Sequence, residues 1–149
     1  MRRTRLQLRL NCAKRNKSAL LKELGKRVWA EKIQDNRFLP YYENLECLEK
    51  ESRERQAGLQ DIISRIMDLQ NKLENARQMY KQMLKLKETG QQPASSSFSA
   101  AKEEERRLKK EVKDCEKKIK AGQETLTAID RQKTEQFDQI GRASCRERV

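Results

Sequence analysis

The chain has 149 residues, of which 39% are charged and only 35% hydrophobic, and its formal net charge is +12. This balance is typical of a coiled coil when the apolar residues share one helical stripe, and of a disordered chain when they do not. The sequence contains no histidine, which removes the commonest general base and the commonest metal ligand. We therefore expect no enzymatic activity, no small-molecule substrate, no cofactor and no metal site.

The four cysteines stand far apart, at Cys12, Cys47, Cys115 and Cys145, without any Cys-x-x-Cys pair. This spacing argues against a zinc site built on paired ligands. Cys115 occupies a core heptad position, so we expect a buried, unreactive thiol rather than a redox sensor. No apolar run approaches the length of a membrane span, and no signal-peptide core is visible, so a cytoplasmic location is expected.

The positive charge is concentrated at the amino-terminal end. Residues 1–22 hold eight Lys or Arg and no acid, whereas residues 23–141 are nearly balanced. Three interpretations stay open: a solvated tail, a surface for nucleic acid or anionic membrane, and an organelle transit peptide. Any affinity for polyanions is expected to reside in this arm. The candidate polyanion-binding residues are Arg2, Arg3, Arg5, Arg9, Lys14, Arg15 and Lys17.

In chain order, residues 1–13 form a basic arm and residues 14–33 a first helix. A turn follows, because Asp35 and Asn36 favour turns and Pro40 restricts the residue before it. The apolar face of the first helix is predicted to consist of Leu20, Leu21, Leu24, Val28 and Trp29.

Residues 41–140 predict an antiparallel coiled-coil hairpin with its loop at residues 89–99. Gly90 suits the left-handed position that ends a helix. Apolar residues recur at steps of three and four in both arms of the hairpin, which favours a left-handed supercoil. The fold class is therefore predicted to be all-α. The two frames are Leu45, Leu48, Ser52, Arg55, Leu59, Ile62, Ile66, Leu69, Leu73, Ala76, Tyr80 and Met83, and Leu108, Val112, Cys115, Ile119, Gly122, Leu126, Ile129, Lys133, Gln136 and Ile140.

The register of the hairpin can be set by folding the chain back at the loop. The predicted register places Ile66 opposite Gly122 and Leu69 opposite Ile119. A shift by one heptad aligns the two frames equally well, because the pattern repeats every seven residues.

Aromatic residues cluster around the turn before the hairpin. Trp29, Phe38, Tyr41 and Tyr42 surround it, and Phe137 returns to the same end of the hairpin. They form either a small core that closes the base of the hairpin or a binding surface, since exposed aromatics often anchor partners.

The sequence LLKELGKRVWAEKI at residues 20–33, followed by a long heptad hairpin, resembles bacterial coiled-coil proteins of unknown function. The resemblance covers residues 14–140. It implies a cytoplasmic helical rod, sometimes joined to a zinc ribbon or a membrane segment, and it transfers no site residue.

The closing sequence IGRASCRERV is similar to a translated sequencing adaptor or vector read-through. It interrupts the heptads and the charge balance together. Residues 141–149 are therefore predicted to be a non-native tail, with Cys145 non-native and a natural carboxy-terminal part missing.

These features predict a non-enzymatic scaffold or protein-interaction module that self-associates or docks on another helix. The alternative is a nucleic-acid-binding accessory protein that uses the basic arm. Salt-dependent retention on nucleic acid separates the two, because phosphate contacts release counterions.

Overall fold

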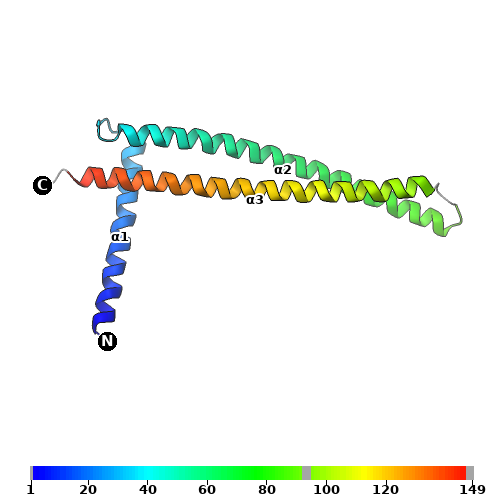
Figure 1. Cartoon of the computed structure of the whole chain (residues 1–149), viewed down its shortest axis with the longest axis horizontal. Coiled ribbons are helices and arrows are strands. Elements are labelled where there is room, and N and C mark those ends of the chain that lie inside the picture. Colours follow the sequence, from blue (N-terminus) through cyan, green and yellow to red (C-terminus); the bar gives the residue numbers. More distant parts are fainter. Residues whose placement is uncertain (1, 92–94, 147–149) are drawn as a thin grey trace. The chain divides into compact units, whose positions relative to one another are not determined.

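The computed structural model describes residues 2–91 and 95–146, and each regular element within them is a helix (Figure 1). Helix α1 spans Arg2–Ala30, α2 spans Leu39–Glu88 and α3 spans Ser95–Cys145. The fold is all-α, an antiparallel hairpin of α2 and α3 preceded by the basic helix α1, as the heptads predict.

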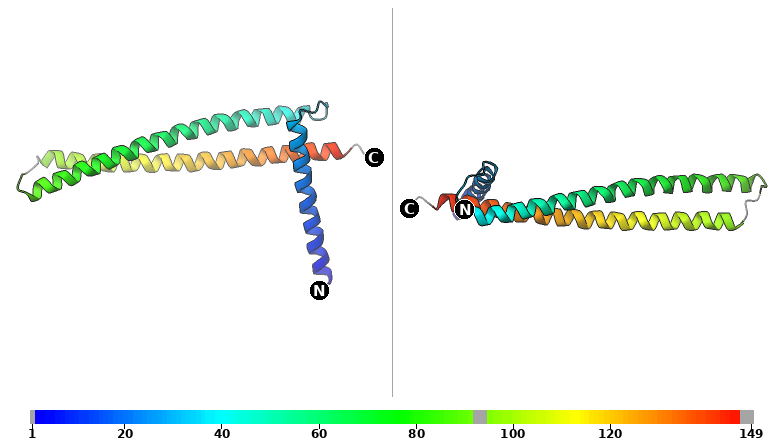
Figure 2. Two further views of the ribbon diagram at one scale, coloured as in Figure 1. Left: turned by 180° about the vertical axis from the view of Figure 1, so that it is seen from behind. Right: turned by 90° about the horizontal axis from the view of Figure 1, so that it is seen from above.

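The chain divides into two compact units. Unit 1 consists of Met1–Glu54 and Leu126–Val149, and unit 2 of Arg55–Thr125. Unit 1 thus holds all of α1 together with the beginning of α2 and the end of α3. Unit 2 is a pair of helical segments from α2 and α3. In each unit these two helices lie side by side and run in opposite directions (Figures 1 and 2).

Helix α1 ends at Ala30, before the predicted end at residue 33. Lys32 adopts a left-handed conformation with φ of 50°, which a continuing helix does not allow. The Lys32 amide then donates to the Trp29 carbonyl, and the Ile33 amide donates to the Val28 carbonyl. This Schellman pattern satisfies the last carbonyls of the helix. The sequence does not predict this ending, because glycine usually occupies the left-handed position.

The loop of the hairpin is shorter than predicted. Gly90 has φ of +80° just after the end of α2, which confirms its predicted role as a cap. However, α3 begins at Ser95, inside the predicted loop at residues 89–99. Because α3 begins this early, Phe98 lies on the helix, and the centroid of its ring is 4.9 Å from that of Tyr80. This contact between tilted rings favours the helical form over a serine-rich coil.

Unit 2 buries one apolar stripe along its helix pair. Its core consists of Leu69, Leu73, Leu108 and Cys115, with Ile62, Ile66, Ala76 and Val112 packed against it. Cys115 is a free, buried cysteine, as its heptad position predicted.

The predicted register is wrong by one heptad. A Cβ atom built on Gly122 lies 2.5 Å from Cδ2 of Leu59, so Leu59, and not Ile66, fills the space opposite this glycine. The salt bridge from Arg77 to Glu105 fits the same shifted register. In unit 1, the Asn44 amide donates to Gln136 at 3.4 Å, which agrees with it. The heptad repeat alone does not decide between the two registers, and the shorter loop is consistent with the one that places Leu59 opposite Gly122.

The buried face of α1 also differs from the prediction. Val28 and Trp29 are buried as expected, but Leu20 is 70% exposed and Leu24 is 36% exposed. Gly25, which has no side chain, is buried instead. Because the backbone of α1 approaches α3 closely at this glycine, the contact face is rotated away from both leucines.

The carboxy-terminal residues continue α3 to Cys145. Gly141 is buried and Ala143 packs against the core of unit 1, so this stretch does not separate from the helix where the prediction begins the tail. Residues 147–149 of the predicted tail lie outside the described residues. The non-native origin of residues 141–149 stays a prediction.

Candidate functional site

The aromatic residues that surround the turn meet in one cluster in unit 1. Its buried members are Val28, Trp29, Phe38, Leu45 and Ile140, and Tyr41, Tyr42, Phe137 and Ala143 pack against them. The five aromatics singled out from the sequence therefore come together at the base of the hairpin. Their packing supports a core role, because a surface prepared for a partner keeps its large side chains exposed.

Polar atoms of the cluster find partners. The Tyr42 hydroxyl donates to the Ile33 carbonyl at 2.8 Å and also lies 3.2 Å from the Val28 carbonyl oxygen, so it holds the end of α1. The ring centroids of Trp29 and Tyr42 lie 5.1 Å apart in an edge arrangement. The indole nitrogen of Trp29 donates to Glu49 at 3.4 Å. These contacts fix the orientation of the rings, as expected of a specific core.

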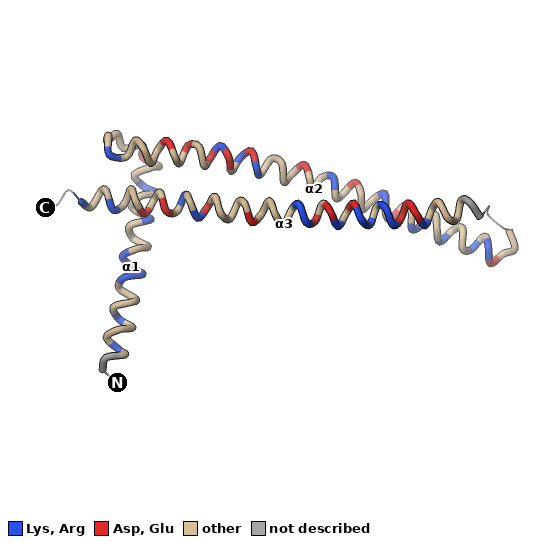
Figure 3. Tube along the Cα trace, viewed as in Figure 1, with Lys and Arg blue, Asp and Glu red and all other residues tan. Residues whose placement is uncertain are grey.

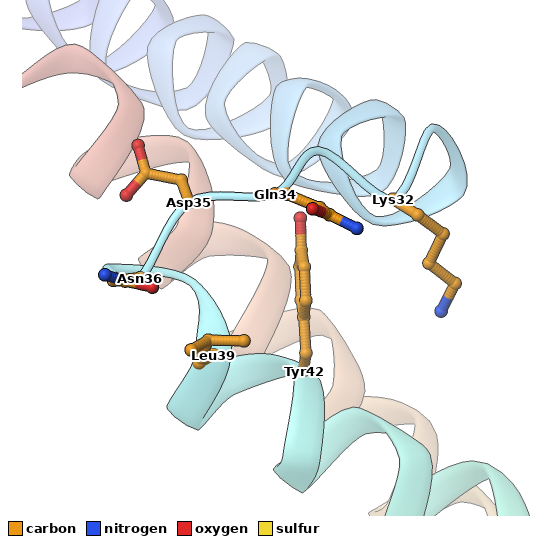
Figure 4. A pocket seen from close by; sticks show the side chains of 6 residues that line it. All are labelled: Lys32, Gln34, Asp35, Asn36, Leu39 and Tyr42. Carbon is orange, nitrogen blue, oxygen red and sulfur yellow. The ribbon is translucent and has the colours of Figure 1, made fainter.

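A shallow hollow lies beside this cluster, on the segment that joins α1 to α2 (Figure 4). The Tyr42 ring stands at its centre, and the Lys32 ammonium lies 3.1 Å from the centroid of the Trp29 ring next to it. The hollow combines a cation, a carboxylate and amides with the apolar surface of Leu39 and the Tyr42 ring. It is lined by Lys32, Gln34, Asp35, Asn36, Leu39 and Tyr42.

Asp35 and Arg37 form a local ion pair at this segment. The Arg37 backbone amide donates to Oδ1 of Asp35 at 2.9 Å, and its Nε donates to both carboxylate oxygens at 3.0 and 3.1 Å. The hydrogen bonds from the Arg37 side chain and amide lower the pKa of Asp35 from 3.8 to about 2. Burial, together with the charge of Asp35, raises the pKa of Tyr42 above its usual value of 10.0. The pair therefore rigidifies the turn and keeps Asp35 ionised.

Two glycines bring α1 and α3 into backbone contact in unit 1. A Cβ built on Gly25 lies 1.9 Å from the carbonyl oxygen of Phe137, and one built on Gly141 lies 2.0 Å from that of Leu21. Any larger residue forces the helices apart. The sequence prediction missed this contact, because neither glycine places an apolar side chain on a helix face. An isolated glycine inside a helical pattern is the sequence signal that points to such a close contact.

The candidate polyanion-binding residues lie on α1. The side chains of Arg5, Arg9, Lys14, Arg15 and Lys17 are exposed, and within unit 1 the first half of the helix projects away from the segments of α2 and α3 (Figures 1 and 2). The side chains of Arg2 and Arg3 lie outside the described part of the structure. At about 100° of rotation per residue, these cations point in several directions around α1 and do not form one face.

An apolar surface of α2 in unit 2 was not identified from the sequence. Ile63 is 39% exposed and Met67 is 60% exposed, one turn apart. They flank Ile62 and Ile66, which are only half-buried in the seam. We refer to Ile62, Ile63, Ile66 and Met67 as the isoleucine face. The signal in the sequence is the run IISRIM, which holds more apolar residues than a two-helix seam can bury.

The described residues contain no group of three or more His, Cys, Asp or Glu side chains that could hold a metal ion. No helix in the described ranges is long and apolar enough to span a membrane. Comparison with known protein families, with curated proteins and with solved structures finds no match. The resemblance to bacterial coiled-coil proteins therefore stays a prediction.

Proposed function

We propose that this chain is a non-enzymatic coiled-coil module that self-associates through the isoleucine face of unit 2. The observation that carries the proposal is the exposure of Ile63 and Met67 beside the half-buried Ile62 and Ile66. A helix pair buries one stripe of each helix and leaves its flanks in water. A second helix pair placed on this face covers those flanks, as in a four-helix bundle.

The chemistry of the carboxylates supports a non-enzymatic role. The pKa values of Asp35 and Glu105 are lowered by hydrogen bonds to neighbouring cations, chiefly Arg37 and Lys109. A carboxyl group that works as a general acid at neutral pH needs a raised pKa. Both groups are shifted in the opposite direction, which suits surface ion pairs that stabilise helices.

Sedimentation equilibrium over a wide range of protein concentrations tests self-association. We expect the native chain to form a dimer, and Ile63→Gln with Met67→Gln to weaken it by at least about a hundredfold. Each dimer loses burial of at least two large apolar side chains, roughly 3 kcal/mol or more.

The matched control replaces Leu20 and Leu24 by Gln. These two α1 leucines have the same spacing and similar exposure, at 70% and 36%, but lie in unit 1. The control is expected to dimerise like the native chain. A native chain that stays monomeric at every concentration would refute the proposal, and equal weakening by both double variants would show that the isoleucine face has no special part.

A further inference from the structure

The outer face of α3 in unit 2 carries an unbroken row of positive charge. On the side of α3 opposite the residues that pack against α2, every position over four helical turns is Lys or Arg. All five side chains are exposed. We call this row the cationic stripe. It consists of Arg106, Lys110, Lys113, Lys117 and Lys120.

The cations of the stripe lie on one side of the helix, so the stripe reflects their spacing as well as the number of Lys and Arg residues. Its members alternate steps of four and three residues, so they fall within about 80° of the helix circumference and extend for ~21 Å along the axis. The seam residues Leu108, Val112 and Cys115 are buried or half-buried on the other side of the same helix. In Figure 3 blue outweighs red along this stretch of α3.

The five cations have no anionic partner within the described part of the chain. Their neighbours behave differently, since Arg107 pairs with Glu104, and Lys109 pairs with Glu105 at 2.7 Å. Consecutive members of the stripe are three or four residues apart, the spacing at which like charges repel on a helix. The folded chain thus keeps an unfavourable row of like charges that an external polyanion would relieve.

We propose that the cationic stripe binds the phosphate backbone of double-stranded nucleic acid without sequence preference. Four of its five members are lysines, which act as point charges on phosphates, whereas base readout relies on bidentate Arg, Asn or Gln. No aromatic side chain lies between residues 99 and 125 to stack on unpaired bases. A duplex therefore fits this surface better than a single strand does.

The surroundings of the stripe favour nucleic acid over a lipid bilayer. A helix that binds a bilayer needs large apolar side chains next to its cations. The residues beside the stripe on α3 are polar or charged, such as Asp114 and Glu116, and the apolar side chains of this segment face α2. Anionic vesicles are nevertheless a second probe in the test.

The experiment measures binding of the full chain to a labelled DNA duplex of random sequence by fluorescence anisotropy as a function of salt. If five phosphates are neutralised, the logarithm of affinity falls against the logarithm of salt with a slope of about −4.5 from the stripe alone. Replacing Lys110, Lys113 and Lys117 by Gln should reduce the magnitude of the slope by about 2.7. The corresponding Arg variant should restore it.

Two control variants remove the same three charges elsewhere. The first replaces the paired cations Arg77, Arg107 and Lys109 by Gln, and the second replaces the exposed arm residues Arg5, Arg9 and Arg15. Each should change the slope by about one at most, because paired or scattered cations meet few phosphates together.

Three results would overturn the proposal. The first is an equal change of slope in all three variants, which would mean that net charge alone attracts DNA. The second is loss of binding only in the arm variant, which would place the surface on α1. The third is stripe-dependent binding to phosphatidylserine vesicles without stripe-dependent binding to DNA. Circular dichroism of each variant checks that the helices are retained.

Discussion

The two units bury apolar side chains to different depths, although both use the same two helices of the hairpin. In unit 1, α1 is a third helix that packs against the core, and the side chains of Leu45 and Ile140 have no exposed surface. In unit 2 the most buried member of the seam, Leu108, keeps 3% of its surface exposed, and the isoleucine face stays open to solvent. A third helix thus closes a core that a helix pair leaves open on its flanks, and the open unit is the one that carries both surfaces proposed above for partners.

The largest expected effect is the formation or complete absence of an engineered disulfide across the seam between α2 and α3 in unit 2. Leu59→Cys with Gly122→Cys, in a chain whose four native cysteines are replaced by Ser, should form a disulfide within one chain. The reason is that a Cβ on Gly122 lies 3.1 Å from Cγ of Leu59, a position close to that of a cysteine sulfur. Non-reducing electrophoresis and mass spectrometry measure the bond.

The comparison variant for this disulfide is Ile66→Cys with Gly122→Cys. It represents the register predicted from the sequence, one heptad or about 10 Å away along the helix. Efficient closure of this second pair, with none in the first, would restore the predicted register.

Core substitutions should separate the two units next. Leu45→Ala in unit 1 is expected to lower the free energy of unfolding by about 5 kcal/mol, because a cavity enclosed by three helices collapses poorly. Leu73→Ala in unit 2 should cost about 2–4 kcal/mol, since an open seam relaxes more easily. Urea denaturation followed by circular dichroism measures both.

Gln70→Ala is the surface control for these core variants and should stay within about 0.5 kcal/mol of the native chain. Equal losses for Leu45→Ala and Leu73→Ala would remove the difference in enclosure between the units.

A pair of glycine substitutions should give effects of opposite sign. Gly25→Ala in unit 1 drives a Cβ into the backbone of Phe137 and should cost about 1–3 kcal/mol, despite the better helix propensity of Ala. Gly58→Ala in unit 2 meets nothing within 4 Å and should stabilise α2 by up to about 1 kcal/mol. Thermal unfolding measures both shifts, and stabilisation by Gly25→Ala would show that α1 does not approach α3 so closely.

The smallest effect concerns Asp35 in the turn of unit 1. Its folded pKa of about 2 lies below the usual value of 3.8, so the ion pair contributes stability above about pH 4. That contribution is lost as the pH falls through about 2. Arg37→Gln should raise the pKa of Asp35 towards 3.8, as carboxyl carbon NMR titration would measure. An unchanged titration curve would mean that Arg37 does not hold this carboxylate.

Local chemistry made part of this architecture predictable. Periodic leucines predict helices, Gly90 predicts the end of α2, and the position of Cys115 predicts its burial. The aromatics could be placed together because the turn and the returning end of the hairpin have to meet. These inferences need only the residue and its neighbours along the chain.

Other features depend on which residue of the neighbouring helix lies opposite, and a heptad pattern that repeats every seven residues does not specify this. The heptads of α2 and α3 align equally well in two registers, and only contacts across the seam, such as that of Leu59 with Gly122, distinguish them. The close contact at Gly25 leaves no apolar side chain to detect. The net charge does not reveal the cationic stripe, because residues 23–141 as a whole are nearly balanced, and only the helical spacing separates its five cations from acids such as Asp114 and Glu116.

The chain contains a single tryptophan, and it lies in the cluster of unit 1 with only 9% of its surface exposed. Unit 2 has Tyr80 and Phe98 as its only aromatic residues. Intrinsic tryptophan emission therefore reports on unit 1 alone, whereas far-ultraviolet circular dichroism reports on the helices of both units. Recorded on one sample during heating, the two signals would coincide for a chain that unfolds as a single cooperative body. Any gap between them would measure how far one unit survives the loss of the other.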